Sequence, residues 1–136
     1  MATKFIAKHQ IALRRLYLND GPCKAISNVI GTTKEEFIKY INSQLINGMT
    51  VENFGKVWGL DHIVPTELFN QDDPNEFKLC WNFNNIMPMF IHDNRKKGAS
   101  VHFSIEKLNK VKSNECVEKL KLICENEIKN TWNKYL

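Results

Sequence analysis

Apolar residues recur with helical spacing in the first third of the 136-residue chain. From Lys4 to about Leu18 they predict an amphipathic helix, which the segment Asn19-Asp20-Gly21-Pro22 ends. A second predicted helix begins after Thr33, which forms a capping box with Glu36, and runs to Asn47-Gly48. We expect these two helices to be packing elements.

The pattern changes in the middle of the chain. Residues 57–65 and 86–91 are short apolar runs that predict two strands, and Pro74 suits the first turn of a short helix that extends to about Trp81. From Ile105 to Trp132, helical spacing returns and predicts one or two helices, with Ser113-Asn114 as the candidate break. Strands and helices in this order predict an α+β fold.

Length and composition fit one globular domain, with a helical part over 1–50, a central part over 51–99 and C-terminal helices over 100–136. No apolar run approaches the roughly 20 residues that cross a bilayer, and the basic residues scattered through the N-terminus do not resemble a signal peptide. We therefore expect an intracellular protein with no membrane partner. The four cysteines lack zinc-binding spacing, and we expect free thiols.

The net charge of +4 is unevenly distributed. Residues 52–93 sum to −5, whereas residues 94–112 sum to +5. Acidic groups beside a polyanion weaken binding unless a cation lies among them. The distribution is therefore consistent with a metal site framed by a phosphate-binding surface, although chance clustering of solvated charges explains it equally well.

Asp61 and His62 form the dipeptide with the clearest chemical potential. Near the end of a strand, both side chains can reach a common cleft. Imidazole is the natural general base near neutral pH, and a carboxylate oxygen is the natural ligand of Mg²⁺. By itself such a pair is more often a pair of surface residues. The neighbouring motifs therefore decide whether it indicates a functional site.

Three motifs follow one another in fixed order around this pair. They are Trp-x-x-Asp-His-Ile-x-Pro at 58–65, Asn-x-x-Pro at 85–88 and Asn-x-x-Lys at 94–97, preceded by a Gly-Met-Thr-x-x-Asn-x-Gly lead-in at 48–55. The region from Gly31 to Gly98 resembles the HNH endonucleases of phages and large DNA viruses. This resemblance implies a ββα-metal core, in which two short antiparallel strands joined by a long loop are followed by one helix, here from Asp93.

The resemblance assigns roles to four residues. Asp61 and Asn94 would be ligands of one Mg²⁺ or Mn²⁺ ion, and His62 would be the general base. Asn85, the middle residue of the catalytic motif, would hold the long loop so that the imidazole is aimed. The family implies hydrolysis of DNA phosphodiester bonds to a 5′-phosphate and a 3′-hydroxyl.

The chain departs from the family pattern at several positions. Gly59 stands where the family often has an accessory histidine, and Met87 replaces a frequent glutamine. Asn82 and Asn84 compete with Asn85 for the middle role, which only the spacing to Pro88 assigns. The asparagine at the third motif position weakens any expectation of zinc, which prefers imidazole and thiolate ligands.

A basic run, Arg95-Lys96-Lys97, begins directly after the candidate ligand at position 94, and we expect it to contact phosphate. Lys107, Lys110 and Lys112 extend it. His92 is a candidate for the nucleic-acid surface or the metal shell, although a surface histidine is the more common case. We expect His9 and His102 to be structural or solvated, and Trp58, Trp81 and Phe90 to belong to the core.

These observations predict a metal-dependent DNA endonuclease of phage or viral type, with duplex or branched DNA as its partner and a homodimer as one route to double-strand cutting. The main alternative is a nucleic-acid-binding protein that retains the HNH scaffold without turnover. A toxin-type nuclease with an inhibitor is the third, but the chain shows no secretion domain.

Overall fold

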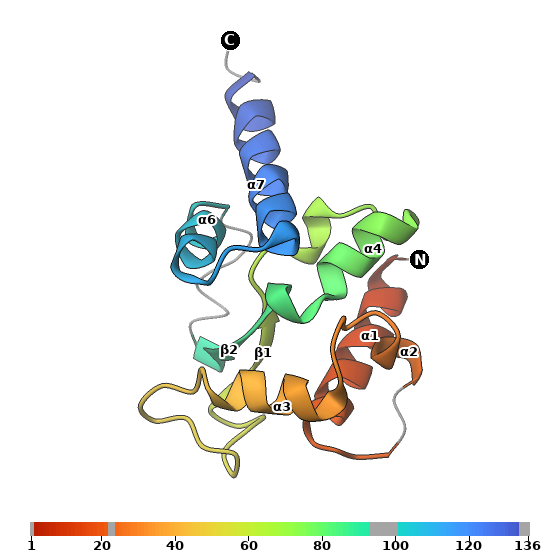
Figure 1. Cartoon of the computed structure of the whole chain (residues 1–136), viewed down its shortest axis with the longest axis vertical. Helices are drawn as coiled ribbons and strands as arrows, with labels where there is room; N and C mark the ends of the chain where they lie inside the picture. Colours follow the sequence, from red (N-terminus) through yellow and green to blue (C-terminus); the bar gives the residue numbers. More distant parts are fainter. Residues whose placement is uncertain (1, 22–23, 93–100, 134–136) are drawn as a thin grey trace.

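The computed structural model describes residues 2–21, 24–92 and 101–133, and it is a mixed α+β structure, as predicted (Figure 1). In chain order its elements are α1 (Ala2–Tyr17), α2 (Lys24–Ser27), α3 (Lys34–Asn42), β1 (Trp58–His62), the 3₁₀ turn η1 (Thr66–Leu68), α4 (Pro74–Trp81), the 3₁₀ turn η2 (Phe83–Asn85), β2 (Ile86–Phe90), α6 (Val101–Lys110) and α7 (Glu115–Asn133). The helix predicted from Asp93 lies outside the described residues.

The two strands form an antiparallel pair at the centre of the molecule, with α1, α2 and α3 on one side and α6 and α7 on the other (Figure 1). The register pairs Trp58 with Phe90 and His62 with Ile86. The first strand is shorter than the predicted 57–65 segment. It ends at His62 because the next amides bond to Asn85: the Ile63 amide to its carbonyl and the Val64 amide to its side chain.

Both predicted N-terminal helices form, as α1 and α3, and the structure adds the short helix α2, which was not predicted. The end of the second predicted helix differs. Thr33 caps α3 by accepting a hydrogen bond from the Glu36 amide at 3.1 Å. The helix ends at Asn42, five residues before the predicted Asn47. At this end the Ser43 hydroxyl and the Gln44 amide both donate to the Tyr40 carbonyl, so side chains satisfy a carbonyl that a further helical turn would have used.

The predicted break between the C-terminal helices is confirmed. The Asn114 side chain accepts a hydrogen bond from the Val117 amide at 2.9 Å and so caps the start of α7. Helix α7 contacts α6, α4 and η2, and its buried residues lie in its first half. Its second half extends away from the rest of the molecule (Figure 1).

One hydrophobic core joins all these elements, and its largest fully buried side chains are Trp58, Trp81, Phe37, Leu13, Leu16, Ile26, Ile30, Ile41, Ile63, Ile86, Leu108 and Leu120. The expectation that Trp58 and Trp81 belong to the core is therefore confirmed, and Phe90 is partly buried against it. Within the described residues, no helix has both the length and the apolar character that a membrane span requires.

Candidate functional site

Asp61 and His62 are the last two residues of β1, and neighbouring residues of a strand face opposite sides of the sheet. Asp61 is half-buried and lies opposite Met87, whereas His62 as a whole residue is only 4% exposed. The Asp61 Oδ2 and His62 Nε2 atoms are both shielded from solvent. The strand end thus places the carboxylate on one face of the sheet and the imidazole on the other, and one atom of each is shielded from solvent.

Trp81, the last residue of α4, fixes the position of the His62 ring. The two rings meet edge to face, with centroids 4.5 Å apart and an interplanar angle of 86°. The indole in turn donates from Nε1 to Gln71 Oε1 at 3.2 Å, and its other neighbour is the buried imidazole of His9, 5.6 Å away. His9 is therefore structural, as predicted, and it belongs to the packing around His62.

Asn85 is completely buried and ties the ends of the long loop together. Its Oδ1 accepts from the Val64 amide at 2.8 Å, and its Nδ2 donates to the Val64 and Cys80 carbonyls at 3.2 and 3.0 Å. Val64 follows His62 by two residues, and Cys80 precedes Trp81. A single amide thus holds both the backbone beyond the imidazole and the helix end that carries its aromatic neighbour.

Asn82 and Asn84, the alternatives to Asn85 for the middle position of the motif, make different hydrogen bonds. The Asn82 side chain accepts from the Asn84 amide at 2.9 Å and from the Asn84 side chain at 2.7 Å. Asn84 also accepts from Asn114 at 3.2 Å. Both are only partly buried, and among these three side chains it is Asn85 that bonds to the backbone beside β1. The geometry therefore agrees with the spacing argument that selects Asn85.

Two side chains from distant parts of the sequence hold the backbone on either side of the Asp61-His62 pair. Gln10 of α1 donates to the Leu60 carbonyl at 3.0 Å, and the Ser104 hydroxyl of α6 donates to the Ile63 carbonyl. Sequence reasoning missed both contacts. They join residues 50 and 41 positions apart, and no local pattern in the sequence signals them.

The structure describes one of the two predicted metal ligands. Asp61 offers a half-buried carboxylate, while Asn94 lies outside the described residues. Among the described residues, no group of three or more His, Cys, Asp or Glu side chains is placed to hold a metal ion. One carboxylate with an amide partner fits Mg²⁺, which retains several waters and usually takes one or two protein carboxylates.

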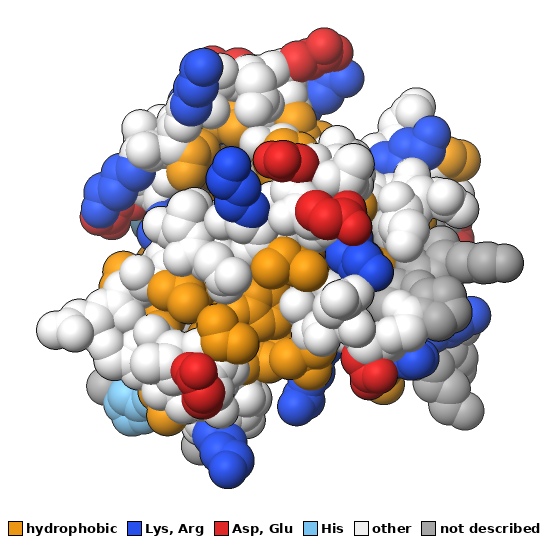
Figure 2. Space-filling model, turned by 60° about the horizontal axis from the view of Figure 1, so that its bottom comes forward, with side chains coloured by type: hydrophobic (Ala, Val, Ile, Leu, Met, Phe, Trp, Pro, Cys, Tyr) orange, Lys and Arg blue, Asp and Glu red, His pale blue; other side chains and the backbone are white. Residues whose placement is uncertain are grey.

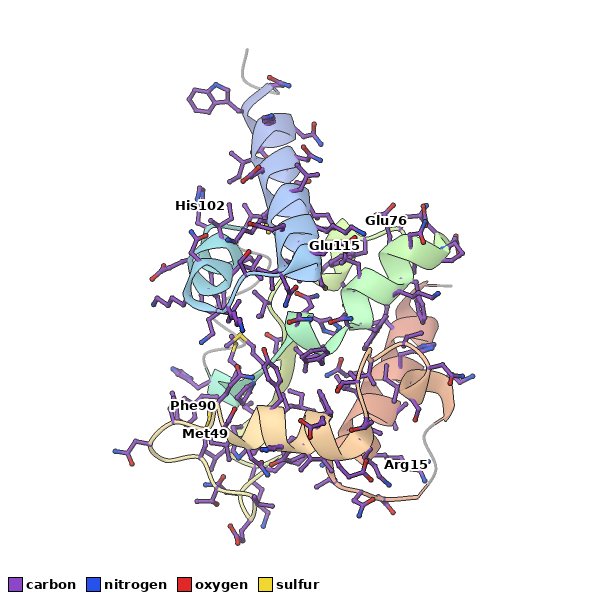
Figure 3. The ribbon with its side chains drawn as sticks, in the orientation of Figure 1. Arg15, Met49, Glu76, Phe90, His102 and Glu115 are labelled. Carbon is purple, nitrogen blue, oxygen red and sulfur yellow. The ribbon has the colours of Figure 1, made fainter. Side chains whose placement is uncertain are left out.

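The predicted phosphate contacts Arg95, Lys96 and Lys97 also lie outside the described residues. His92, two residues after the end of β2, is exposed. Figure 3 shows the exposed His102 on the side of α6 that faces away from the sheet, which agrees with its prediction as a solvated residue.

The cysteine thiols that the structure describes are weakly reactive near neutral pH. Cys80, Cys116 and Cys124 are free cysteines, whereas Cys23 lies outside the described residues. Burial raises the pKa of the Cys80 thiol to about 12 and that of Cys124 to about 11. These protonated thiols are poor nucleophiles and poor metal ligands near neutral pH.

Gly59 carries no side chain on the sheet surface beside Asp61. Among the residues that the structure describes, a Cβ atom at this position would have no neighbouring atom within 4 Å outside the residues next to it in the chain, and the φ angle of Gly59 lies outside the left-handed region that favours glycine. Gly59 pairs with Met89, and Asp61 pairs with Met87. Because alternate residues share a face, these four residues lie on one side of the sheet.

No family model matches the chain, and no solved structure matches it. Curated proteins that it matches include Uncharacterized protein L246 of Acanthamoeba polyphaga mimivirus, with 33% identity over 85 residues, which are 60% of this chain and 38% of that protein. Another is Uncharacterized protein L426 of the same virus, with 29% identity over 66 residues, which are 48% of this chain and 29% of that protein. The chain thus spans less than two fifths of the length of these relatives, and it is similar to viral proteins, as predicted.

Proposed function

We propose that the chain contains an HNH-type ββα-metal nuclease site that hydrolyses DNA phosphodiester bonds. The arrangement of Asp61, His62 and Asn85 is the observation that supports this most directly. A carboxylate and an imidazole end one strand of an antiparallel pair, and a buried asparagine directly before the other strand holds the loop between them. The resemblance assigns the roles of ligand, base and loop anchor to these three residues.

The chemistry follows from these groups. His62 would take the proton of the attacking water, and its contact with Trp81 limits the orientations of the ring. Asp61, with Asn94, would hold the cation. A bound Mg²⁺ or Mn²⁺ would polarise the phosphate and stabilise the charge that develops on it and on the leaving oxygen.

The test is cleavage of supercoiled plasmid with Mg²⁺, Mn²⁺ or EDTA. Wild type should nick or cut only with the cation. His62→Ala should lose about 10²- to 10⁴-fold in rate while remaining folded by circular dichroism. The matched control is His102→Ala, which removes an exposed histidine and should cut at the wild-type rate. Equal rates for wild type and His62→Ala would remove His62 as the base.

Asp61 requires a separate measurement, because it is proposed to bind the cation and not the proton. Asp61→Ala should weaken Mn²⁺ binding in isothermal titration calorimetry, whereas Asp72→Ala, an exposed aspartate in the long loop, should not. An unchanged Mn²⁺ isotherm in Asp61→Ala would remove this residue from the metal site.

The burial of His62 favours a second candidate, a nucleic-acid-binding protein with an HNH scaffold that does not turn over. A general base must contact water, and the residue His62 is only 4% exposed. Such a protein would bind DNA in a salt-dependent manner and leave the plasmid intact with every cation tested.

A further inference from the structure

A groove of about 410 Å³ runs along β2 between α6 and the segment that follows α3. Its floor is apolar and includes Met87, Met89, Phe90 and Phe103. Figure 3 shows Met49, another lining residue, next to Phe90 beside β2. On the face in Figure 2, hydrophobic side chains gather between charged ones. The volume is within the range of ligand-binding pockets, roughly 300–1,000 Å³.

Two residues that line this groove, Met87 and Met89, lie on the same face of the sheet as the candidate ligand Asp61. Met87 lies directly opposite Asp61, and Met89 lies opposite Gly59. Residues that pair across an antiparallel ladder project from the same face, so the methionines that line the groove share the face of the carboxylate. Gly59 adds no side chain to that face, and no described residue beyond its chain neighbours comes within 4 Å of the position its Cβ would take.

The charges beside the groove are mainly basic and come from α6. Lys107 and Lys110 line it together with Glu106, which forms an ion pair with Lys110 at 3.5 Å. They belong to the 94–112 segment with its net charge of +5. Basic side chains beside aromatic rings are the combination that binds single-stranded nucleic acid, in which bases stack on rings and cations track the backbone.

Other occupants fit less well. An extended peptide would add to the free edge of β2, but Pro88 has no amide hydrogen to donate there. A regular duplex presents phosphates outward and keeps its bases stacked, so it cannot use an apolar floor.

We propose that this groove binds a single-stranded nucleic acid, with an unpaired base stacked on Phe90 and Phe103 and the backbone phosphates held by Lys107 and Lys110. The inference rests on the proposed nuclease function and names its substrate class: DNA with a single-stranded segment, such as a flap, gap or branch. The unpaired strand would enter along β2 and reach Asp61 on the same face of the sheet.

The test is fluorescence anisotropy with a labelled dT₂₀ strand and a 20-base-pair duplex, both in EDTA, so that binding is measured without cleavage. Wild type should bind the single strand more tightly. Phe103→Ala should weaken single-strand binding by roughly 5- to 100-fold, as expected for lost base stacking, with little change for the duplex. Phe103→Tyr, which retains a ring, should restore it.

Glu106→Gln gives a result that misfolding cannot imitate. It removes a negative charge from the groove and releases Lys110 from its ion pair, so single-strand affinity should rise several-fold and its salt dependence should steepen. Lys107→Ala should weaken binding. Lys129→Ala, an exposed lysine in the second half of α7, is the matched control and should change nothing.

Two results would overturn the inference. One is equal affinity for single strand and duplex with no effect of Phe103→Ala. The other is a dimer in sedimentation velocity that Phe103→Ala dissociates, because a second copy would then occupy the groove. Failure of the nuclease function appears separately, as the predicted single-strand binding with no metal-dependent cleavage of a flap substrate.

Discussion

The side chain of Asn85 makes three hydrogen bonds to two backbone segments without any exposure to water. Removing it leaves the Val64 amide and the Val64 and Cys80 carbonyls without these bonds inside the protein. The cost of an unsatisfied buried group is about 1–3 kcal/mol. The residue is therefore a structural requirement of the site, whatever chemistry the site performs.

We expect Asn85→Ala to lower the free energy of unfolding by about 3 kcal/mol or more. Asn84→Ala, which removes a partly buried amide that bonds to Asn82 and Asn114, should cost less than about 1 kcal/mol. Urea unfolding followed by tryptophan fluorescence measures both. Equal costs would show that the buried bonds of Asn85 do not hold the loop.

The raised pKa of the buried Cys80 thiol leads us to expect that the free energy of unfolding falls at alkaline pH. Burial raises its pKa from 9.0 to about 12, so between these values the folded chain retains a proton that the unfolded chain loses. Its contribution is fully present below pH 9 and is lost as the pH rises toward 12.

Wild type should therefore lose about 1.4 kcal/mol more unfolding free energy between pH 8 and pH 10 than Cys80→Ala does. Urea titrations at both pH values give the comparison, and Cys124 contributes equally to both proteins. Parallel losses in the two proteins would contradict the burial of this thiol.

Among the elements, α4 matters most to the site, because its last turn carries Cys80 and Trp81. Its start is well specified. Asp73 accepts hydrogen bonds from the Asn75 amide at 2.8 Å and the Glu76 amide at 3.3 Å, and Pro74 occupies the first turn. Capping chemistry far from His62 thus helps to orient its aromatic neighbour.

Asp73→Ala should lower the free energy of unfolding by about 1 kcal/mol, and Asp73→Asn by much less, because asparagine also caps helices well. Asp72→Ala, which removes the neighbouring exposed carboxylate, should have almost no effect. The comparison requires thermal unfolding of the three variants. A loss in Asp72→Ala as large as that in Asp73→Ala would argue against a capping role.

The elements that could be predicted from sequence are those whose signals are local. Proline at the start of α4, the capping box of α3 and the two apolar runs each specify an element within a few residues. The contacts of Gln10 and Ser104 with the backbone around His62 could not be predicted, because they depend on how distant helices pack. The motif residues of the candidate site could be identified in the sequence, whereas the side chains that contact the backbone around them could not.

In the molecule as a whole, the core reaches only the first half of α7. Val117, Leu120 and Cys124 are completely buried, whereas residues 129–133 are exposed. The described fold therefore depends on the start of this helix, and its second half is available for other contacts.

A chain that ends at residue 128 should unfold within about 0.5 kcal/mol of the full chain. A chain that ends at residue 119 loses Leu120 and Cys124 and should be largely unfolded, because each deletion of a buried side chain costs about 2–5 kcal/mol. Circular dichroism during heating distinguishes the two. Marked destabilisation of the longer chain would place part of the core beyond residue 128.

Position 59 could accept a side chain by substitution, so the set of groups at the candidate site could change during evolution. Its backbone angle suits other residues, and a Cβ atom there would meet no atom of a described residue within 4 Å beyond its chain neighbours. A histidine or aspartate could therefore arise at this position by substitution without moving the strand. The new group would share the face of Asp61 and add a donor to that side of the sheet. If the proposed metal site exists, one substitution at Gly59 would change its set of ligands and leave intact the loop that Asn85 holds.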